Sequence, residues 1–337
     1  MKLIAFYLPQ FYENEINNKN WGKGFTEWTH IIQSSNYNTR IFKPIMPTEL
    51  GYYDLKDDNV RHAQARLAKE YGISAWCYYY YRFNGQRFLD LPLERHFDDK
   101  KLDMPFLICW ANENWTRSWD GLANNILVKQ EHNLEDDINF IKEVGPMLID
   151  DRYFKINGKP VVLIYRTELW GNIKKTVNIW RSYMSKTYNK EIYLIRCHGF
   201  DRKTNPSDID FDASYQFPPF NLQKSKDSSD YSNFNSYAKE KVSYKLFRGV
   251  MSGFCNIPRK KERGDIHINA NPINYKIWLK EAIRFTIDNF SKKEEHIIFI
   301  NAWNEWGEGA VLEPSNQWGR EYLEKTKECL IETNYEN

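Results

Sequence analysis

The feature that most constrains the fold is an alternation of short apolar runs with longer segments of helical periodicity. Eight runs rich in β-branched and aromatic residues recur along the chain, each followed by a polar turn. They lie at residues 3–8, 73–80, 105–110, 161–165, 192–197, 211–217, 246–251 and 296–302. Several are apolar on both faces, as expected for parallel strands that helices cover from outside. Eight strand-then-helix units predict an α/β fold, namely a (β/α)8 TIM barrel with long loops at its C-terminal face.

Helical periodicity is clearest after Asp57, which, like its neighbour, can cap the start of a helix. There Val60, Gln64 and Leu67 recur at a spacing of three to four residues, and Gly72 follows as a stop. Further helices are predicted over residues 134–148, 176–188, 273–290 and 320–332, and irregular loops over 12–54 and 218–235. A chain of 337 residues fits one barrel domain spanning residues 1–337.

Aromatic residues are frequent: 12 Trp, 22 Tyr and 20 Phe make up 16% of the chain, and many stand beside Asn, Glu, Arg or Gly. Pyranose rings present apolar C–H faces to aromatic side chains and hydroxyl edges to planar polar groups, so this pattern is typical of sugar sites. Core packing is the alternative for any single aromatic residue. The net charge is only +2, and one short basic cluster occurs, at Arg259, Lys260, Lys261 and Arg263, which argues against a nucleic-acid partner.

The five cysteines are widely spaced and three lie within apolar runs, which predicts reduced core residues. Residues 1–10 contain no recognisable signal peptide, and no apolar stretch is long enough to span a bilayer. These observations predict a cytoplasmic protein without a transmembrane segment. No metal-binding or phosphate-loop motif occurs and the seven histidines are scattered, so neither a metal nor another cofactor is expected.

Two polar features remain open at this stage. His198 follows the fifth apolar run and fits either a functional site or the core. Asp208 and Asp210 match the loose Asp-x-Asp pattern of metal-dependent sugar-nucleotide transferases. They precede the sixth run, however, which places them at the mouth of the barrel opposite to the expected site.

The segment after the eighth run, Asn301-Ala-Trp-Asn-Glu-Trp-Gly-Glu-Gly309, carries two carboxylates three residues apart. An extended chain would turn Glu305 and Glu308 to opposite sides, but the glycines at 307 and 309 favour a turn. On a helix-like turn, Cβ atoms three residues apart are roughly 5–6 Å apart, close to the carboxyl spacing of retaining glycosidases. We therefore predict that this pair is catalytic. A structural role for one glutamate, in a cap or an ion pair with an arginine, is the alternative.

Polar and aromatic residues also follow the other strands, where barrel enzymes place their chemistry. Asn112, Asn114 and Arg117 are predicted to hold sugar hydroxyls, with Glu113 as a third acidic group or as the ion-pair partner of Arg117. The full set of predicted substrate-binding residues is Tyr7, Gln10, Glu27, Trp28, Trp110, Asn112, Glu113, Asn114, Trp115, Arg117, Tyr165, Asn301, Trp303, Asn304 and Trp306.

Five motifs occur in order and together resemble one family. They are Phe6-Tyr-Leu-Pro-Gln-Phe-Tyr12, Trp21-Gly-Lys-Gly-Phe-Thr-Glu-Trp28, Gly51-Tyr-Tyr-Asp54, Cys109-Trp-Ala-Asn-Glu-Asn-Trp-Thr-Arg117 and Phe299-Ile-Asn-Ala-Trp-Asn-Glu-Trp-Gly-Glu-Gly309. From about Lys2 to Leu323 the chain resembles the WbsX-type proteins of bacterial surface-polysaccharide gene clusters, which are often called glycosyltransferases and are related to glycoside hydrolase family 99.

Family 99 enzymes are (β/α)8-barrel endo-α-mannosidases and mannanases that retain anomeric configuration through a Glu-x-x-Glu motif, matched here by Glu305-Trp-Gly-Glu308. The resemblance implies that Glu305 deprotonates the 2-hydroxyl of the substrate, which attacks its own anomeric carbon to give a 1,2-anhydro sugar. It implies that Glu308 is the general acid and then the base. The implied substrate is an oligosaccharide or polysaccharide, free or lipid-linked.

Three functions stay open on the sequence. The first is a retaining glycosidase or transglycosidase that acts on a surface polysaccharide or its precursor. The second is a glycosyltransferase of O-antigen or capsule biosynthesis, which needs a nucleotide-linked or lipid-linked donor, although no diphosphate-binding motif is visible. The third is a sugar-binding barrel without catalysis.

Overall fold

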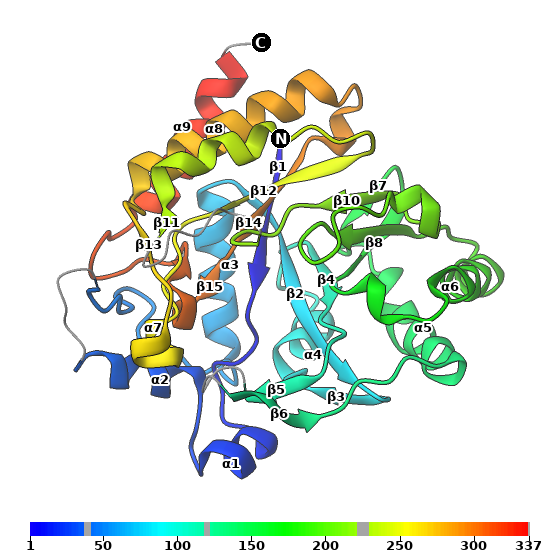
Figure 1. The fold of residues 1–337 in the computed structure, drawn as a ribbon, viewed down its shortest axis with the longest axis horizontal. Coiled ribbons are helices and arrows are strands. Elements are labelled where there is room, and N and C mark those ends of the chain that lie inside the picture. Colours follow the sequence, from blue (N-terminus) through cyan, green and yellow to red (C-terminus); the bar gives the residue numbers. More distant parts are fainter. Residues whose placement is uncertain (37–41, 118–121, 221–228, 336–337) are drawn as a thin grey trace.

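The computed structural model describes residues 1–36, 42–117, 122–220 and 229–335. Its centre is a closed barrel in which every neighbouring pair of the eight strands is parallel (Figure 1). In barrel order the strands are β1 (Lys2–Tyr7), β2 (Ile73–Phe83), β4 (Phe106–Trp110), β8 (Lys159–Ile164), β9 (Tyr193–Cys197), β10 (Ala213–Tyr215), β12 (Leu246–Met251) and β14 (Ile297–Asn301). Strand β14 pairs again with β1 and closes the barrel. The eight predicted strands and the predicted fold class are confirmed.

The barrel interior is filled by aromatic side chains from strands on different sides. Phe6 of β1 stacks on Tyr79 of β2 with 5.4 Å between ring centroids, and it lies 5.7 Å from Tyr215 and 6.0 Å from Phe299. Phe217, two residues beyond Tyr215, meets Phe6 edge to face at 4.9 Å. Because these rings occupy the axis, the barrel is a packed core whose uppermost layer is the floor for whatever binds above it.

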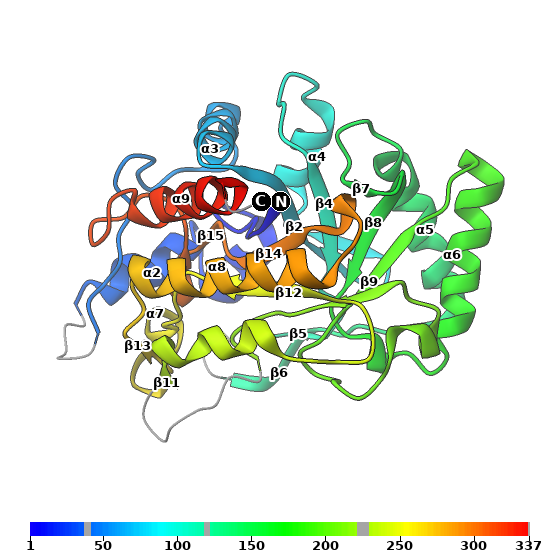
Figure 2. The same ribbon diagram turned by 90° about the horizontal axis from the view of Figure 1, so that it is seen from above.

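Helices cover the outside of the barrel (Figures 1 and 2). They are α3 (Asp58–Glu70), α4 (Leu91–Asp98), α5 (Leu134–Leu148), α6 (Ile173–Tyr188), α8 (Pro272–Asn289) and α9 (Glu321–Tyr335). After β9 and β10, short 3-10 helices take this position: η3 (Pro206–Ile209) and η4 (Tyr231–Lys239). Asp57 caps α3 by accepting a hydrogen bond from the amide of Asn59 at 2.9 Å, as predicted. Gly72, which lies between α3 and β2, has φ +87°, a conformation that favours glycine.

The stretch 12–54, predicted to be irregular, contains two short helices, α1 (Glu15–Trp21) and α2 (Glu27–Ser34). Helix α2 begins with a capping box between Thr26 and Thr29. Smaller elements decorate the loops: β3 (Gln86–Phe88), β5 (Trp115–Arg117), β6 (Leu122–Val128), β7 (Lys155–Ile156), η2 (Thr167–Leu169), β11 (Ser229–Asp230), α7 (Ile257–Lys260), η5 (Lys261–Arg263), β13 (His267–Ile268), η6 (Lys293–Glu295), β15 (Asn304–Glu305), η7 (Trp306–Glu308) and β16 (Ala310–Val311).

The cysteines are buried and reduced, as expected of core residues; they are Cys77, Cys109, Cys197, Cys255 and Cys329. Within the described ranges, the helices are too short or too polar to cross a lipid bilayer.

Candidate active site

A cavity of about 170 Å³ lies at the carboxyl ends of the barrel strands. Its floor and walls come from loops that follow different strands, which is the usual position of the site in barrel enzymes. The lining residues are Leu8, Gln10, Tyr79, Tyr81, Phe83, Ala111, Glu113, Asn114, Trp115, Thr116, Tyr165, Phe217, Arg259, Glu305 and Glu308. Both glutamates of the predicted pair thus face the same space.

The turn that carries the pair is anchored to the first strand. Asn304 accepts a hydrogen bond from the amide of Leu8 at 2.7 Å and donates one to its carbonyl at 3.1 Å. Glu305 ends β15, which pairs with β16, and the 3-10 helix η7 brings Glu308 back toward the cavity. Gly309 closes the turn with φ +61°. The helix-like turn expected after the eighth strand is therefore present.

One arginine contacts three glutamates at this site. Arg259 on α7 donates from Nε to Oε1 of Glu27 at 2.6 Å, from Nη1 to Oε1 of Glu308 at 2.8 Å, and from Nη2 to Oε2 of Glu305 at 2.9 Å. Its side chain is only 5% exposed. Because Nη1 and Nη2 belong to one planar fork, the carboxyl groups of Glu305 and Glu308 lie side by side. In the sequence, Arg259 is distinguished only as part of a basic cluster.

Gly307 makes this arrangement possible. A Cβ atom on this residue would lie 2.1 Å from Oε1 of Glu27 and 2.5 Å from Nε of Arg259. Those distances are far below van der Waals contact, so only glycine leaves room for the Glu27–Arg259 pair behind the turn.

Burial is the largest influence on Glu305 and raises its pKa to about 8. Arg259 lowers this pKa, while the charges of Glu308 and Glu27 raise it. Burial also raises the pKa of Tyr79 and of Tyr81, and the charge of Glu305 adds to both shifts. The carboxyl group of Glu305 is therefore held in a dry, negatively charged surrounding.

Aromatic rings form one wall of the cavity. Trp115 stacks on Phe83 at 5.9 Å and on Tyr81 at 6.4 Å. Gln10 donates from Nε2 to the hydroxyl of Tyr81 at 3.2 Å, and its own amide oxygen is buried without a hydrogen-bond partner among the described residues. A ring with an apolar face and a hydroxyl edge would be matched by this wall and by the unpaired oxygen.

Glu113 also lines the cavity, and its partner is Arg166 at 2.8 Å. The alternative ion pair with Arg117 is not tested, since the Arg117 side chain lies outside the described residues. Asn112 is fully buried and holds the loop, accepting a hydrogen bond from the amide of Arg166 at 2.8 Å and donating one to its carbonyl at 2.8 Å. Asn114 lines the cavity and accepts a hydrogen bond from the amide of Gln130 at 2.7 Å.

Several predicted substrate-binding residues lie outside the cavity lining. The hydroxyl of Tyr7 donates to Gln64 at 2.7 Å on the helix side of β1, and Trp110 stacks on Phe140 of α5 at 4.2 Å. Trp28 donates to the carbonyl of Tyr53 at 2.7 Å. Also buried away from the lining are Asn301, Trp303, Asn304, Trp306 and Glu27, whereas Tyr165 does line it.

His198 belongs to a buried network. It bonds the hydroxyl of Tyr244 at 2.9 Å and Glu240 at 3.2 Å, which fits the core alternative. Asp208 lies in η3, ahead of β10, as the sequence order required. In the described part of the chain, His, Cys, Asp and Glu form no group that could hold a metal ion.

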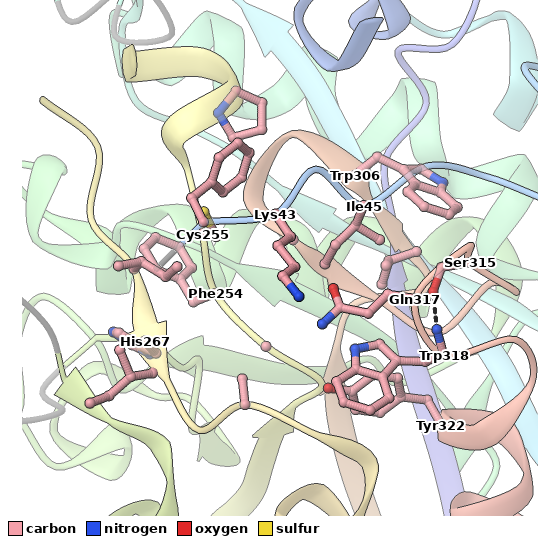
Figure 3. A pocket seen from close by; sticks show the side chains of 18 of the residues that line it. Lys43, Ile45, Phe254, Cys255, His267, Trp306, Ser315, Gln317, Trp318 and Tyr322 are labelled. Carbon is pink, nitrogen blue, oxygen red and sulfur yellow. Dashed lines mark hydrogen bonds between the residues drawn. The ribbon is translucent and has the colours of Figure 1, made fainter. Parts of the chain in front are cut away.

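A second cavity, of about 380 Å³, lies behind the same turn. Trp306 and Gly309 line it, so the backbone of the turn separates the two cavities. Figure 3 shows Lys43 and Gln317 pointing toward each other in its middle, with Trp318 and Tyr322 at one end. Among the described residues that line it, none is acidic. The two cavities therefore differ in charge.

Comparison with known proteins gives a family and a fold. Residues 3–326 match the family described as "Glycosyltransferase WbsX". WxcX proteins from two strains of Xanthomonas campestris pv. campestris are 36% identical over 97% of this chain, which spans about half of their length (49%). A solved structure described as a "Glycoside hydrolase-like protein" superposes with a TM-score of 0.62 at 14% identity. The superposition covers 97% of this chain and 93% of that protein's chain. The GH99 endo-α-mannosidase of Bacteroides thetaiotaomicron has a TM-score of 0.60 at 16% identity, covering 99% and 97%.

Proposed function

The chain belongs to the WbsX glycosyltransferase family of carbohydrate-active enzymes, and from this premise we propose that it acts on glycosidic bonds with retention of configuration. The proposed substrate is a bacterial surface polysaccharide or its precursor, free or lipid-linked. Glu305 and Glu308 are the proposed catalytic residues, in a hydrolase or a transglycosidase.

The observation that carries this proposal is the shared environment of the two carboxylates. Both line one small cavity, and both accept hydrogen bonds from neighbouring nitrogens of Arg259. Two adjacent carboxyl groups beside an aromatic wall are what a retaining mechanism at one sugar ring requires. A purely structural pair would have no need to face an open space.

In the proposed first step, the Glu305 carboxylate takes the proton of the 2-hydroxyl, and O2 forms a bond to the anomeric carbon. The bond from that carbon to the leaving oxygen breaks, and Glu308 gives this oxygen its proton. Burial favours this role for Glu305, because its raised pKa of about 8 makes the ionised form a strong base.

In the second step, the Glu308 carboxylate takes a proton from water or from a sugar hydroxyl. The resulting oxygen attacks the anomeric carbon, the bond to O2 breaks, and Glu305 returns the proton to O2. Two inversions at the same carbon give net retention. The assignment of these roles follows the resemblance to family 99, and the geometry of the site is compatible with it.

Substrate binding is proposed to use the remaining lining. The unpaired amide oxygen of Gln10 would accept a hydrogen bond from a sugar hydroxyl, and the Glu113–Arg166 pair would meet hydroxyls at the rim. Trp115 would stack against a pyranose face. The predicted binding residues that line the cavity are Gln10, Glu113, Asn114, Trp115 and Tyr165.

The charge of this cavity disfavours a nucleotide-linked donor. Arg259 is the cation among the described lining residues, and it is already shared by three carboxylates. Glu113 adds a further negative group, which would repel a diphosphate. A neutral glycan donor fits better, and transfer to another sugar then becomes a transglycosylation.

The second candidate function is a glycosyltransferase with a phosphate-linked donor, in keeping with the name of the family. The observation that favours it is the neighbouring cavity, whose described lining holds the Lys43 ammonium and no carboxylate. Isothermal titration with nucleotide sugars and with sugar phosphates tests it. Saturable binding that Lys43→Gln weakens would support a transferase, and no binding at millimolar concentration would refute a phosphate-linked donor at this site.

The test of the first function uses α-mannosides with a good leaving group, such as dinitrophenyl mannosides, and longer α-mannan fragments. Wild type is expected to turn them over, and Glu305→Gln to lose at least about 100-fold in kcat/KM. Equal turnover by wild type and Glu305→Gln would refute the assignment.

A further inference from the structure

We propose that Glu27 is a positioning residue of this active site: acting through Arg259, it fixes the side chains of Glu305 and Glu308 and places a negative charge behind them without touching substrate. From the sequence alone, Glu27 is predicted to bind substrate directly. This inference rests on the proposed function for its catalytic meaning, although its physical content concerns the four side chains alone.

The position of Glu27 separates it from substrate. It is the first residue of α2 and is 0% exposed, and it is absent from the cavity lining, whereas Arg259 lines the cavity. Its Oε1 accepts a hydrogen bond from Nε of Arg259 at 2.6 Å. Glu27 therefore does not line the cavity itself, and its hydrogen-bond partner Arg259 does.

The contact at Nε sets the direction of the whole guanidinium. Nε and the two Nη atoms lie in one plane, so fixing Nε on Glu27 leaves Nη1 and Nη2 pointing at Glu308 and Glu305, where they are found at 2.8 and 2.9 Å. The α2 helix is thereby connected to the catalytic turn through a single side chain. Without Glu27, the guanidinium would lose the contact that fixes Nε, while those at Nη1 and Nη2 would remain.

Packing at Gly307 gives independent support. Oε1 of Glu27 lies against the backbone of Gly307, just before Glu308, so closely that a Cβ would be only 2.1 Å away. The carboxyl group of Glu27 thus also contacts the turn directly. The segment cannot shift toward α2 without meeting this oxygen.

The charge of Glu27 is costly, which suggests that it is used. Its Oε2 is buried without a hydrogen-bond partner among the described residues. A buried carboxylate with an unpaired oxygen is destabilising, and a neutral glutamine could accept the same hydrogen bond from Arg259. The negative charge adds to the affinity of Glu305 for a proton.

The groups that face Glu305 come from several elements, and the test must consider all of them. They are Arg259, Glu308, Glu27, Tyr79 and Tyr81. Both tyrosines have pKa values raised by burial, so they stay neutral over the range in which Glu305 titrates. The charges beside Glu305 are therefore those of Arg259, Glu308 and Glu27, and a substitution at Glu27 changes only the last of them.

The experiment is a titration of the Glu305 carboxyl carbon by ¹³C NMR in glutamate-labelled full chain, with Glu305→Gln identifying the resonance. Glu27→Gln is expected to lower the midpoint of Glu305 by about one pH unit, because one neighbouring like charge is removed. Glu27→Asp keeps the charge and is expected to leave the midpoint nearly unchanged. A midpoint unchanged in Glu27→Gln would overturn the proposal.

The matched control is Glu295→Gln, which removes another buried carboxylate that pairs with a cation, Lys245, at 2.6 Å. It is expected to lower stability without moving the Glu305 midpoint. Should Glu27→Gln fail to fold, Arg259→Lys tests the same link, since loss of the fork is expected to raise the midpoint. An unmoved midpoint in that variant would equally overturn the proposal.

The titration needs no turnover, so its result is separate from that of the proposed function. If the protein cleaved no glycoside and the midpoint still moved, the positioning role would stand and the proposed reaction would fail. With an active enzyme, the acid limb of the kcat/KM profile is expected to move to lower pH in Glu27→Gln. A merely structural residue would lower stability and leave that limb in place.

Discussion

Nε1 of Trp306 donates a hydrogen bond of 2.7 Å to Oε2 of Glu313, so the residue that follows Glu305 is held from behind by a buried carboxyl group. Glu313 also accepts hydrogen bonds from Tyr53 at 2.9 Å and from Gln64 at 2.7 Å. The turn that carries Glu305 and Glu308 is thus supported by α2 through Glu27 and by this network through Trp306. The Glu313 support is sensitive to pH, because burial raises the pKa of this carboxyl group.

Glu313→Gln is expected to remove part of the pH dependence of stability. Burial raises the pKa of Glu313 to about 7, although hydrogen bonds from Gln64, Trp306 and Tyr53 oppose the shift. Since the folded state then holds a proton that the unfolded state releases near pH 4.5, stability falls as pH rises from about 4.5 to 7. Urea unfolding at pH 5 and pH 8 should show wild type losing about 3 kcal/mol more than the variant over this interval. An equal change in the free energy of unfolding between pH 5 and pH 8 in both proteins would contradict a protonated Glu313.

Gly307→Ala is expected to damage activity more than stability alone would explain. The new methyl group would overlap Glu27 and Arg259, so the two carboxylates would lose their common partner. We expect kcat/KM to fall at least about 100-fold, as misplacement by 1 Å can cause. Gly171→Ala is the matched control, because a Cβ there meets nothing within 4 Å. A Gly307→Ala enzyme with the activity of Gly171→Ala would show that the close packing is unimportant.

The pH profile of kcat/KM distinguishes the two roles of the pair. As a base, Glu305 must be ionised, so activity is expected to rise with pH with a midpoint near its pKa of about 8. If Glu305 were the general acid, activity would fall through the same range. Initial rates from pH 5 to 10 on an activated α-mannoside decide between them.

Substrates without a 2-hydroxyl test the route through a 1,2-anhydro sugar. The account predicts that 2-deoxy α-mannosides bind to the aromatic wall but are not turned over, because no internal nucleophile remains. We expect that the 2-deoxy analogue inhibits the enzyme and that its leaving group is not released. Its turnover at rates near those of the parent mannoside would instead indicate a covalent glycosyl-enzyme intermediate.

The barrel could be predicted because each strand has a recognisable local sequence pattern. Strands buried on both faces need continuous apolar runs, and all eight were placed within a few residues of their observed bounds. The 3-10 helices that replace two of the outer helices could not be predicted in the same way. The η3 helix has only four residues, and part of the segment that leads into η4 lies outside the described residues.

Successive side chains of a strand point alternately into the barrel and toward the outer helices. The sequence does not show which residues at the strand ends point toward the cavity. In β2, Tyr79 and Tyr81 line the cavity, while Tyr78 bonds His96 of α4 at 3.0 Å and Tyr80 bonds Glu143 of α5. A shift of one residue exchanges these sides. The same alternation turns Trp110 outward, so that it stacks on Phe140 of α5. The sequence predicts instead that this residue contacts a sugar.

Arg259 was missed because its partners are remote in sequence. It stands 232 residues from Glu27 and 46 from Glu305, on a helix of four residues within a basic cluster. Such a cluster is usually solvated, and nothing local distinguishes the one member that turns inward. Gly307 was the available signal: a glycine between two acids indicates that something packs closely against the backbone.

The most direct test of the central claim follows the anomeric configuration of the first product by ¹H NMR during cleavage or transfer of an α-mannoside. The account predicts that the first-formed product is α, with its signal absent in Glu305→Gln and in Glu308→Gln acting on an unactivated substrate. A first-formed β product would mean a single displacement and would contradict the assignment of Glu305 and Glu308 as a retaining pair.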